Sequence, residues 1–219
     1  MRTTQTRLLL LFILFIISNH VSAANRYWVG IAAGNWSSAS NWSSSSGSFG
    51  GASVPGASDN VIFDGGFFWI SQGKCTIDMA VNVAGITVTS GYGGTIVQGA
   101  NSITVSGAAS FGGGTFTGGA ADIIIGGAFT ISGTAFTSPS AAMELQGDAA
   151  FTGGSFTHHN GLVRFNDAAA ENITGTSPDF YDLEFTGRGS SYTISSTGNI
   201  DVANSLIISG TSSYTLNAG

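Results

Sequence analysis

The chain has 219 residues, of which only 8% are charged, and its six basic and twelve acidic side chains give a formal net charge of −6. An acidic chain without a basic cluster is a poor partner for nucleic acid or an anionic membrane surface. A single cysteine, Cys75, excludes an internal disulfide. Because Cys75 alternates with the apolar residues Ile77 and Met79, we expect a buried thiol, with a reactive thiol as the alternative.

Residues 1–23 have the pattern of a secretory signal peptide. Arg2 and Arg7 are followed by an unbroken apolar run at 8–17, and small residues close the segment. The run is too short to span a bilayer comfortably, although an uncleaved anchor is the alternative. We therefore expect a secreted or cell-surface chain with no membrane insertion after signal cleavage.

Residues 24–73 form a predicted N-terminal cap that contains every tryptophan of the chain: Trp28, Trp36, Trp42 and Trp69. A solenoid has to cover its first coil, because an open end exposes both the core and unpaired strand edges. Large aromatic side chains suit that purpose since each buries a large apolar area. The alternative is that the edges of Trp36 and Trp42 are exposed and stack on sugar rings.

From residue 74 onward, apolar and polar residues alternate as they do in strands. Ile86 and Val88 precede Ile103 and Val105 by seventeen residues. We therefore expect these two pairs to stack on each other in a coil shorter than those that follow.

Residues 103–185 repeat with a period of twenty, which is typical of a solenoid. Three sets of apolar residues recur in register, and we predict that each set points inward. The first set is Ile103/Val105, Ile123/Ile125, Met143/Leu145, Val163/Phe165 and Leu183/Phe185; the second is Phe111, Ile131 and Phe151; the third is Phe116, Phe136 and Phe156. The sequence thus predicts an all-β fold: a right-handed parallel β-helix over 74–219, with three short strands in each coil of about 20 residues.

Glycines recur at corners two residues after the first set, at 107, 127, 147 and 187, with Asp167 in the missing place. We expect these glycines to supply a positive φ. Beyond Phe185 the register drifts, and we interpret Leu206/Ile208, Tyr192/Ile194 and Tyr214/Leu216 as later strands. No polar cap follows them, so the β-helix is expected to be truncated at its C-terminal end.

Several segments resemble the opening of large bacterial secreted repeat proteins. They are Arg26-Tyr-Trp-Val-Gly30, Gly34-Asn-Trp-Ser37, Asn41-Trp-Ser43, Val54-Pro-Gly56 and Val61-Ile-Phe-Asp64. Gly114-Thr-Phe-Thr-Gly118 and Ser155-Phe-Thr-His-His-Asn-Gly161 are similar to their repeats. The family comprises adhesin-like β-solenoids, including proteins with autotransporter-associated strand repeats. The resemblance implies a structural role outside the cell and no catalytic residues.

The outward positions between the first inward pairs include Glu144, Arg164 and Glu184. On adjacent coils these side chains form an alternating ion ladder. The alternative is a carbohydrate-binding or polysaccharide-cleaving face, since β-helix lyases and hydrolases use carboxylates and arginine on one face. Further carboxylates nearby supply candidate acid–base groups or calcium ligands, namely Asp167, Glu171, Asp179 and Asp182.

Three smaller candidates remain. Thr117, Thr137 and Thr157 form an outward column that suits ice binding, although threonine is also common on exposed strands. His158 and His159 are adjacent and therefore poor joint metal ligands. Asp59 and Asp64 are calcium ligands in one interpretation and turn caps in the other.

The sequence predicts a secreted or cell-surface structural repeat protein, an adhesin-like stalk or scaffold, rather than an enzyme. Extracellular glycans or cell-surface components are the expected partners, and no cofactor is expected, with Ca²⁺ as the alternative. A polysaccharide-active enzyme using Glu144, Arg164 and Glu184 is the alternative function, followed by the ice-binding solenoid.

Overall fold

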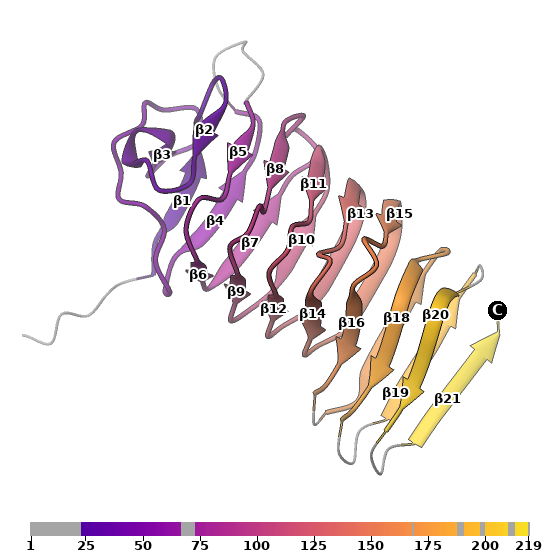
Figure 1. Ribbon diagram of the computed structural model, residues 1–219. Coiled ribbons are helices and arrows are strands. Elements are labelled where there is room, and N and C mark those ends of the chain that lie inside the picture. The colour runs from indigo at the N-terminus through magenta and orange to yellow at the C-terminus, as the bar shows by residue number, and fades with distance from the viewer. Residues whose placement is uncertain are drawn as a thin grey trace, which may run out of the picture.

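A computed structural model describes residues 23–66, 73–167, 169–187, 191–197, 200–209 and, by their backbone, 213–218. The chain winds into a parallel β-solenoid of about six turns, spaced about 21 residues apart, so the predicted parallel β-helix is confirmed. Figure 1 shows the strands side by side along one axis, from the indigo N-terminal end to the yellow C-terminal end. The predicted signal peptide up to residue 22, and Trp69, lie outside the described residues.

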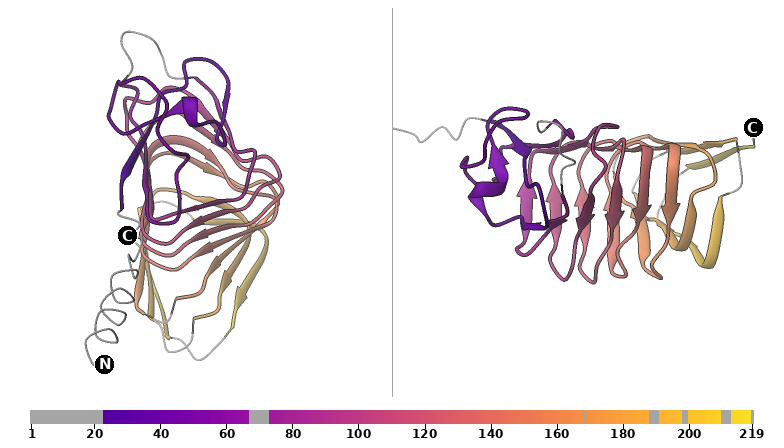
Figure 2. Two further views of the ribbon diagram at one scale, coloured as in Figure 1. Left: turned by 90° about the vertical axis from the view of Figure 1, so that its left-hand side faces the viewer. Right: turned by 90° about the horizontal axis from the view of Figure 1, so that it is seen from above.

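Three faces of stacked strands surround the core, and the view along the axis in Figure 2 shows the outline of the coils. The first face consists of β6 (Val81–Val83), β9 (Ile103–Val105), β12 (Ile123–Ile125), β14 (Ala142–Leu145), β16 (Leu162–Phe165), β18 (Asp179–Phe185) and β20 (Asp201–Ile208). Its pairing is parallel and in the predicted register: Ile103 lies beside Ile123, and Ile123 beside Met143.

The second face begins in the cap and continues to the last described strand. It consists of β1 (Asn25–Trp28), β4 (Asn60–Phe63), β7 (Gly85–Val88), β10 (Ala109–Phe111), the first parts of β13 (Phe129–Thr137) and β15 (Ala149–Thr157), then β17 (Glu171–Gly175), β19 (Ser191–Ser196) and β21 (Ser213–Ala218). Tyr192/Ile194 and Tyr214/Leu216 lie in the strands β19 and β21, as predicted, and Tyr192 pairs with Tyr214 and Ile194 with Leu216.

The third face is shorter. It consists of β2 (Gly34–Asn35), β5 (Cys75–Thr76), β8 (Thr95–Val97), β11 (Thr115–Thr117) and the last parts of β13 and β15. The second and third faces of two coils therefore share one bent strand, β13 or β15. After β15 each described coil has two separate strands, and β18 has a register shift between Phe180 and Asp182, with the Phe180 ring 5.3 Å from that of Phe156.

The predicted inward positions are confirmed: each residue of the three repeated sets is at most 6% exposed. Like side chains stack on like along the third face, where the Phe136 ring lies parallel to Phe116 at 4.5 Å and to Phe156 at 5.7 Å between centroids. Phe111 meets Phe136 edge-to-face at 5.0 Å, which joins the second face to the third. The core is thus one continuous cluster that runs from the cap tryptophans to Tyr192.

The predicted stacking of Ile86 and Val88 on Ile103 and Val105 is wrong. Val81 and Val83 pair with Ile103 and Val105 on the first face, whereas Ile86 and Val88 pair with Ala109 and Phe111 on the second. The error arises because the strands of both faces have the same apolar–polar–apolar pattern, which does not identify a face.

The corner glycines are needed for a reason other than the predicted one. Among the described residues, φ is positive at Gly99, Gly114, Gly154 and several other glycines. It is not positive at Gly107, Gly127 or Gly147. A Cβ added to Gly127 lies 2.8 Å from the carbonyl carbon of Gly107, and one added to Gly147 lies 2.8 Å from that of Gly127. These glycines therefore permit close stacking of successive corners.

The cap is part of the solenoid as well as its cover. β1 pairs in parallel with β4, and β2 with β5, as the strands of any other coil do. The short strand β3 (Trp42–Ser43), preceded by the 3₁₀ turn η1 (Ala39–Asn41), pairs antiparallel with β1 and covers its outer edge. An antiparallel strand in this position prevents a further parallel coil from being added there.

Candidate functional site

The predicted outward column on the first face is in register. Glu144 pairs with Arg164, and Arg164 with Glu184, on β14, β16 and β18. Arg164 Nη1 donates to Glu144 Oε1 at 2.9 Å, and Arg164 Nε donates to Glu184 Oε2 at 2.7 Å. The three side chains form one ion ladder across three coils.

The guanidinium and carboxylate groups that a polysaccharide-cleaving enzyme would use on its substrate are hydrogen-bonded to one another in the ion ladder. The hydrogen bond to Glu184 is the main reason that the pKa of Arg164 is raised, and Glu144 adds to it. The other carboxyl oxygen of Glu144 accepts a hydrogen bond from Asn166 Nδ2 at 3.1 Å. The geometry therefore holds the register of three coils and uses both glutamates as acceptors.

The threonine column on the third face is also in register. Thr117 pairs with Thr137, and Thr137 pairs with Thr157. On the preceding strand, β8, the equivalent position is Val97. Thr117 and Thr157 are exposed and Thr137 is half-buried. Parallel strands in a sheet lie about 4.8 Å apart, so the threonines recur at that interval along the third face.

The two cap tryptophans do not present their rings to solvent. Trp36 is 1% exposed and Trp42 is fully buried, and their rings meet edge-to-face at 4.7 Å. Trp42 Nε1 donates to the carbonyl oxygen of Trp36 at 2.7 Å. The aromatic core predicted for the cap is what the structure contains, and the alternative, exposed ring edges that stack on sugars, is wrong. Both rings are buried because they pack into the core of the first coil.

Among the predicted calcium ligands, Asp59 and Asp64 cap turns. Asp59 accepts hydrogen bonds from the backbone of Gly56 at 2.9 Å and Ala24 at 3.2 Å, and Asp64 accepts one from Gly66 at 3.0 Å. These contacts match the turn-cap interpretation.

The later carboxylates serve separate local contacts. Asp182 accepts a hydrogen bond from Asn204 Nδ2 at 2.7 Å, and Asp179 lies 3.9 Å from His158 Nε2. Glu171 is buried at 1% exposure. Burial, with smaller contributions from the neighbouring charges of Asp167 and Asp148, raises its pKa to about 8. Across the described part of the chain, no three His, Cys, Asp or Glu side chains come together as a potential metal site.

The two remaining candidates have simple environments. Cys75 is fully buried, and burial raises the pKa of its thiol, which makes the thiolate scarce. The backbone of His159 donates to Ser138 Oγ at 3.3 Å, while the side chain of the adjacent His158 faces Asp179. The buried thiol predicted for Cys75 is confirmed.

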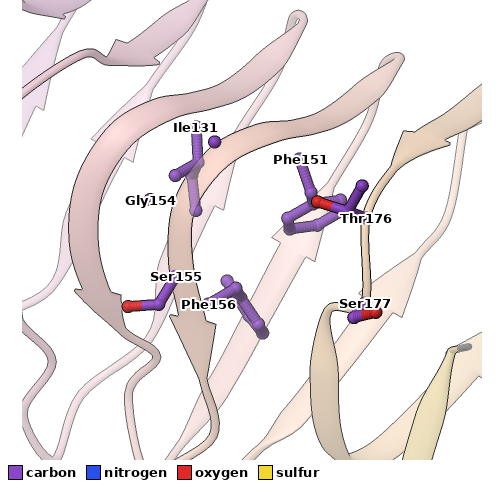
Figure 3. A pocket seen from close by; sticks show the side chains of 8 residues that line it. Ile131, Phe151, Gly154, Ser155, Phe156, Thr176 and Ser177 are labelled. Carbon is purple, nitrogen blue, oxygen red and sulfur yellow. The ribbon is translucent and has the colours of Figure 1, made fainter. Parts of the chain in front are cut away.

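A pocket at the end of the third face was not predicted. Its volume is about 260 Å³, and we call it the β15 notch; it is lined by Ile131, Phe151, Gly153, Gly154, Ser155, Phe156, Thr176 and Ser177. Figure 3 shows Ser155 and Phe156 on β15 opposite Thr176 and Ser177 of the next coil. A signal for it exists in the sequence, because the equivalent residues Phe129, Ala149 and Ile173 are separated first by twenty residues and then by twenty-four.

No helix in the described residues has both the length and the apolar character needed to cross a membrane. Comparisons of the chain with protein-family models, with curated proteins and with solved structures find no match.

Proposed function

We propose that this chain is a secreted or cell-surface structural repeat protein that acts as an adhesin-like stalk or scaffold. The observation that carries the proposal is the continuous core, in which equivalent side chains stack from coil to coil in register. Each coil is stabilised mainly by its neighbours, so stability accumulates along the axis and a long, stiff body forms from a simple repeat.

The surface chemistry supports the same proposal. The strongest charges on the first face neutralise one another in the ion ladder, and the third face presents threonine and serine hydroxyls. A weakly charged, hydroxyl-rich surface suits contact with extracellular glycans or other cell-surface components, because it offers many hydrogen-bonding groups at a low desolvation cost.

A direct comparison with the enzyme alternative uses the mature chain, residues 24–219, and its Arg164→Ala variant. We expect an elongated scattering profile and no turnover of acidic polysaccharides by either protein, with Thr104→Ala as the matched surface control. Turnover by the wild-type chain that is lost in Arg164→Ala but kept in Thr104→Ala would establish the polysaccharide-active enzyme instead.

Ice binding is the second candidate, and the in-register hydroxyl array favours it. Thr115, Ala135 and Ser155 form a column parallel to Thr117, Thr137 and Thr157. A thermal-hysteresis measurement on the mature chain and on Thr137→Lys decides it. Hysteresis that Thr137→Lys abolishes supports ice binding, while the absence of hysteresis in the wild-type chain rejects it.

A further inference from the structure

One acidic side chain lies inside the wall of the later coils. Glu171 begins β17 and alternates inward with Ile173, and it is only 1% exposed. Neither oxygen of its carboxyl group has a hydrogen-bond partner among the described residues. A buried polar group without a partner costs free energy, and an ionised one costs far more. The fold therefore holds this carboxyl group in surroundings that suit its neutral form.

The neighbouring coils explain why the carboxyl group has no partner. By the register of β15 and β17, the equivalent position in the preceding coil is Gly147, which has no side chain. In the next coil Glu171 pairs with Tyr192 of β19, which is also 1% exposed. The single O–H of Tyr192 donates to the carbonyl oxygen of Phe165 at 3.2 Å. Glu171 is thus covered by β19 without a side-chain donor from either neighbouring coil.

The charges that face Glu171 are negative. Asp148, at the corner before β15, is held beside β17 because its Oδ1 accepts hydrogen bonds from the backbone and side-chain nitrogens of Asn172, at 2.7 and 3.3 Å. Asp167 lies at the corner between β16 and β17. β15 and β19 carry no charged side chain, and Arg164 of β16 is held in the ion ladder. No positive charge among the described residues offsets the two aspartates.

Ionisation of Glu171 is linked to opening of this wall. Burial, with smaller contributions from the two aspartates, raises its pKa from 4.5 to about 8, and the backbone of Asp167 opposes the rise only in part. In an opened coil water reaches the carboxyl group, and the pKa returns to its ordinary value. Between the two values the closed state keeps the proton and the opened state releases it. Opening therefore becomes nearly tenfold more frequent for each pH unit.

The strand that must move is β19, because it lies between Glu171 and the last described strand of the second face. β19 pairs with β17 on one side and with β21 on the other, and β20 pairs with β18 on the first face. These strands form the yellow end of the solenoid in Figure 1. The coils from the cap to β16 stack on one another without β19, so they can stay closed when it opens.

We propose that Glu171 is a pH-sensitive latch for the last described coils. Its neutral form keeps β19, β20 and β21 packed on β17 and β18, and its ionisation opens these three strands while the coils up to β16 stay folded. The Tyr192 ring, whose centroid lies 5.0 Å from that of Phe185, leaves the core in this opening. The surface at this end of the solenoid therefore changes with the pH of its surroundings.

Residue-resolved hydrogen exchange on the mature chain tests the latch between about pH 5.5 and 7.5. Protection factors remove the intrinsic pH dependence of exchange, and they report the opening equilibrium when closing is faster than exchange. The amide of Thr197 reports on the β17–β19 ladder, because it donates to the carbonyl oxygen of Gly175 at 3.1 Å. By the alternation of a parallel ladder, the amide of Thr193 points the same way. The amide of Ile103, which donates to the next coil on the first face, reports on the early coils.

We expect the protection factors of Thr193 and Thr197 to fall by about fiftyfold over this range, and that of Ile103 to change by less than about threefold. Glu171→Gln should remove the fall, because the amide does not ionise, while Asp201→Asn, which removes an exposed carboxylate of β20, should keep it. A flat wild-type profile, an equal fall at Ile103, or a fall that persists in Glu171→Gln would overturn the proposal.

A carbon-13 titration of the glutamate carboxyl groups in the wild-type chain gives a second readout that needs no substitution. We expect the carboxyl carbon of Glu171 to titrate well above the ordinary value of 4.5. A midpoint near 4.5 would show that water reaches the carboxyl group in the closed coils, and would also overturn the proposal.

Discussion

Glu171 is a carboxyl group buried inside the second face, and its environment makes the stability of the later coils depend on pH. Its pKa is raised from 4.5 to about 8, chiefly by burial. Between these two values the unfolded chain releases the proton while the folded chain retains it. Stability is therefore highest below about pH 4.5 and decreases as the pH rises toward 8, by up to about 1.4 kcal/mol for each pH unit.

Replacement of Glu171 by glutamine should remove this dependence, because the amide has the shape of the protonated acid and does not ionise. We expect the free energy of unfolding of the wild-type chain to decrease between about pH 5 and pH 8, and that of Glu171→Gln to change much less. Denaturant titrations across this range check it, with the exposed carboxylate variant Asp201→Asn as control. A steep decrease in Glu171→Gln would show that another group is responsible.

Gly127 is the residue at which close stacking of coils can be tested most simply. In Gly127→Ala the new methyl group meets the backbone of Gly107 and Ala108, which has no flexible side chain to move aside. We expect a loss of about 1–3 kcal/mol in the free energy of unfolding.

The control is Gly56→Ala, where the nearest atom to the added Cβ is a carboxylate oxygen of Asp59 at 3.9 Å. Its stability should stay within about 0.5 kcal/mol of the wild-type value. Equal effects of the two substitutions would mean that the corners of successive coils are not closely stacked.

At the scale of the strands, the ion ladder links β14, β16 and β18 through side chains that are 16–31% exposed. A double-mutant cycle of Arg164→Met and Glu184→Gln should give a coupling energy of about 0.5–1 kcal/mol at low salt. The coupling should shrink at about 1 M salt, where the Debye length is about 3 Å. A coupling of zero at low salt would contradict an ion ladder that stabilises the register.

The sequence was sufficient to predict the inward strand positions, because a period of twenty places equivalent side chains on one another. It was also sufficient for the order of Glu144, Arg164 and Glu184. It was insufficient for Ile86 and Val88, since two faces share one pattern. The corner glycines were found but misinterpreted, because a close approach and a positive φ select the same residue.

The functional surfaces were harder to predict than the strands. The aromatic core of the cap was predicted from the size of the rings, but no local pattern specifies how β3 folds over β1. The end of the third face depends on a shift between 149 and 173 that looks like an ordinary loop insertion until the strands are placed in space.

On the scale of the whole molecule, the chain is a stack whose coils bury their apolar residues against one another. Two side chains of β20 show what happens without such a neighbour. Leu206 and Ile208 occupy the inward positions of Leu183 and Phe185, yet both are 55% exposed because no described coil covers them. Such a stack is suited to extend and to present a surface, which is the basis for the proposed scaffold outside the cell.

The most direct test of that account is the location of the chain in cells that produce it. An antibody against residues 24–219 is applied to intact cells, to their medium and to lysed cells, with a chain lacking residues 1–23 as control. The account predicts antigen on intact cells or in the medium, sensitive to protease added outside, and its retention inside when residues 1–23 are removed. Antigen detected only after lysis for the full-length chain would contradict it.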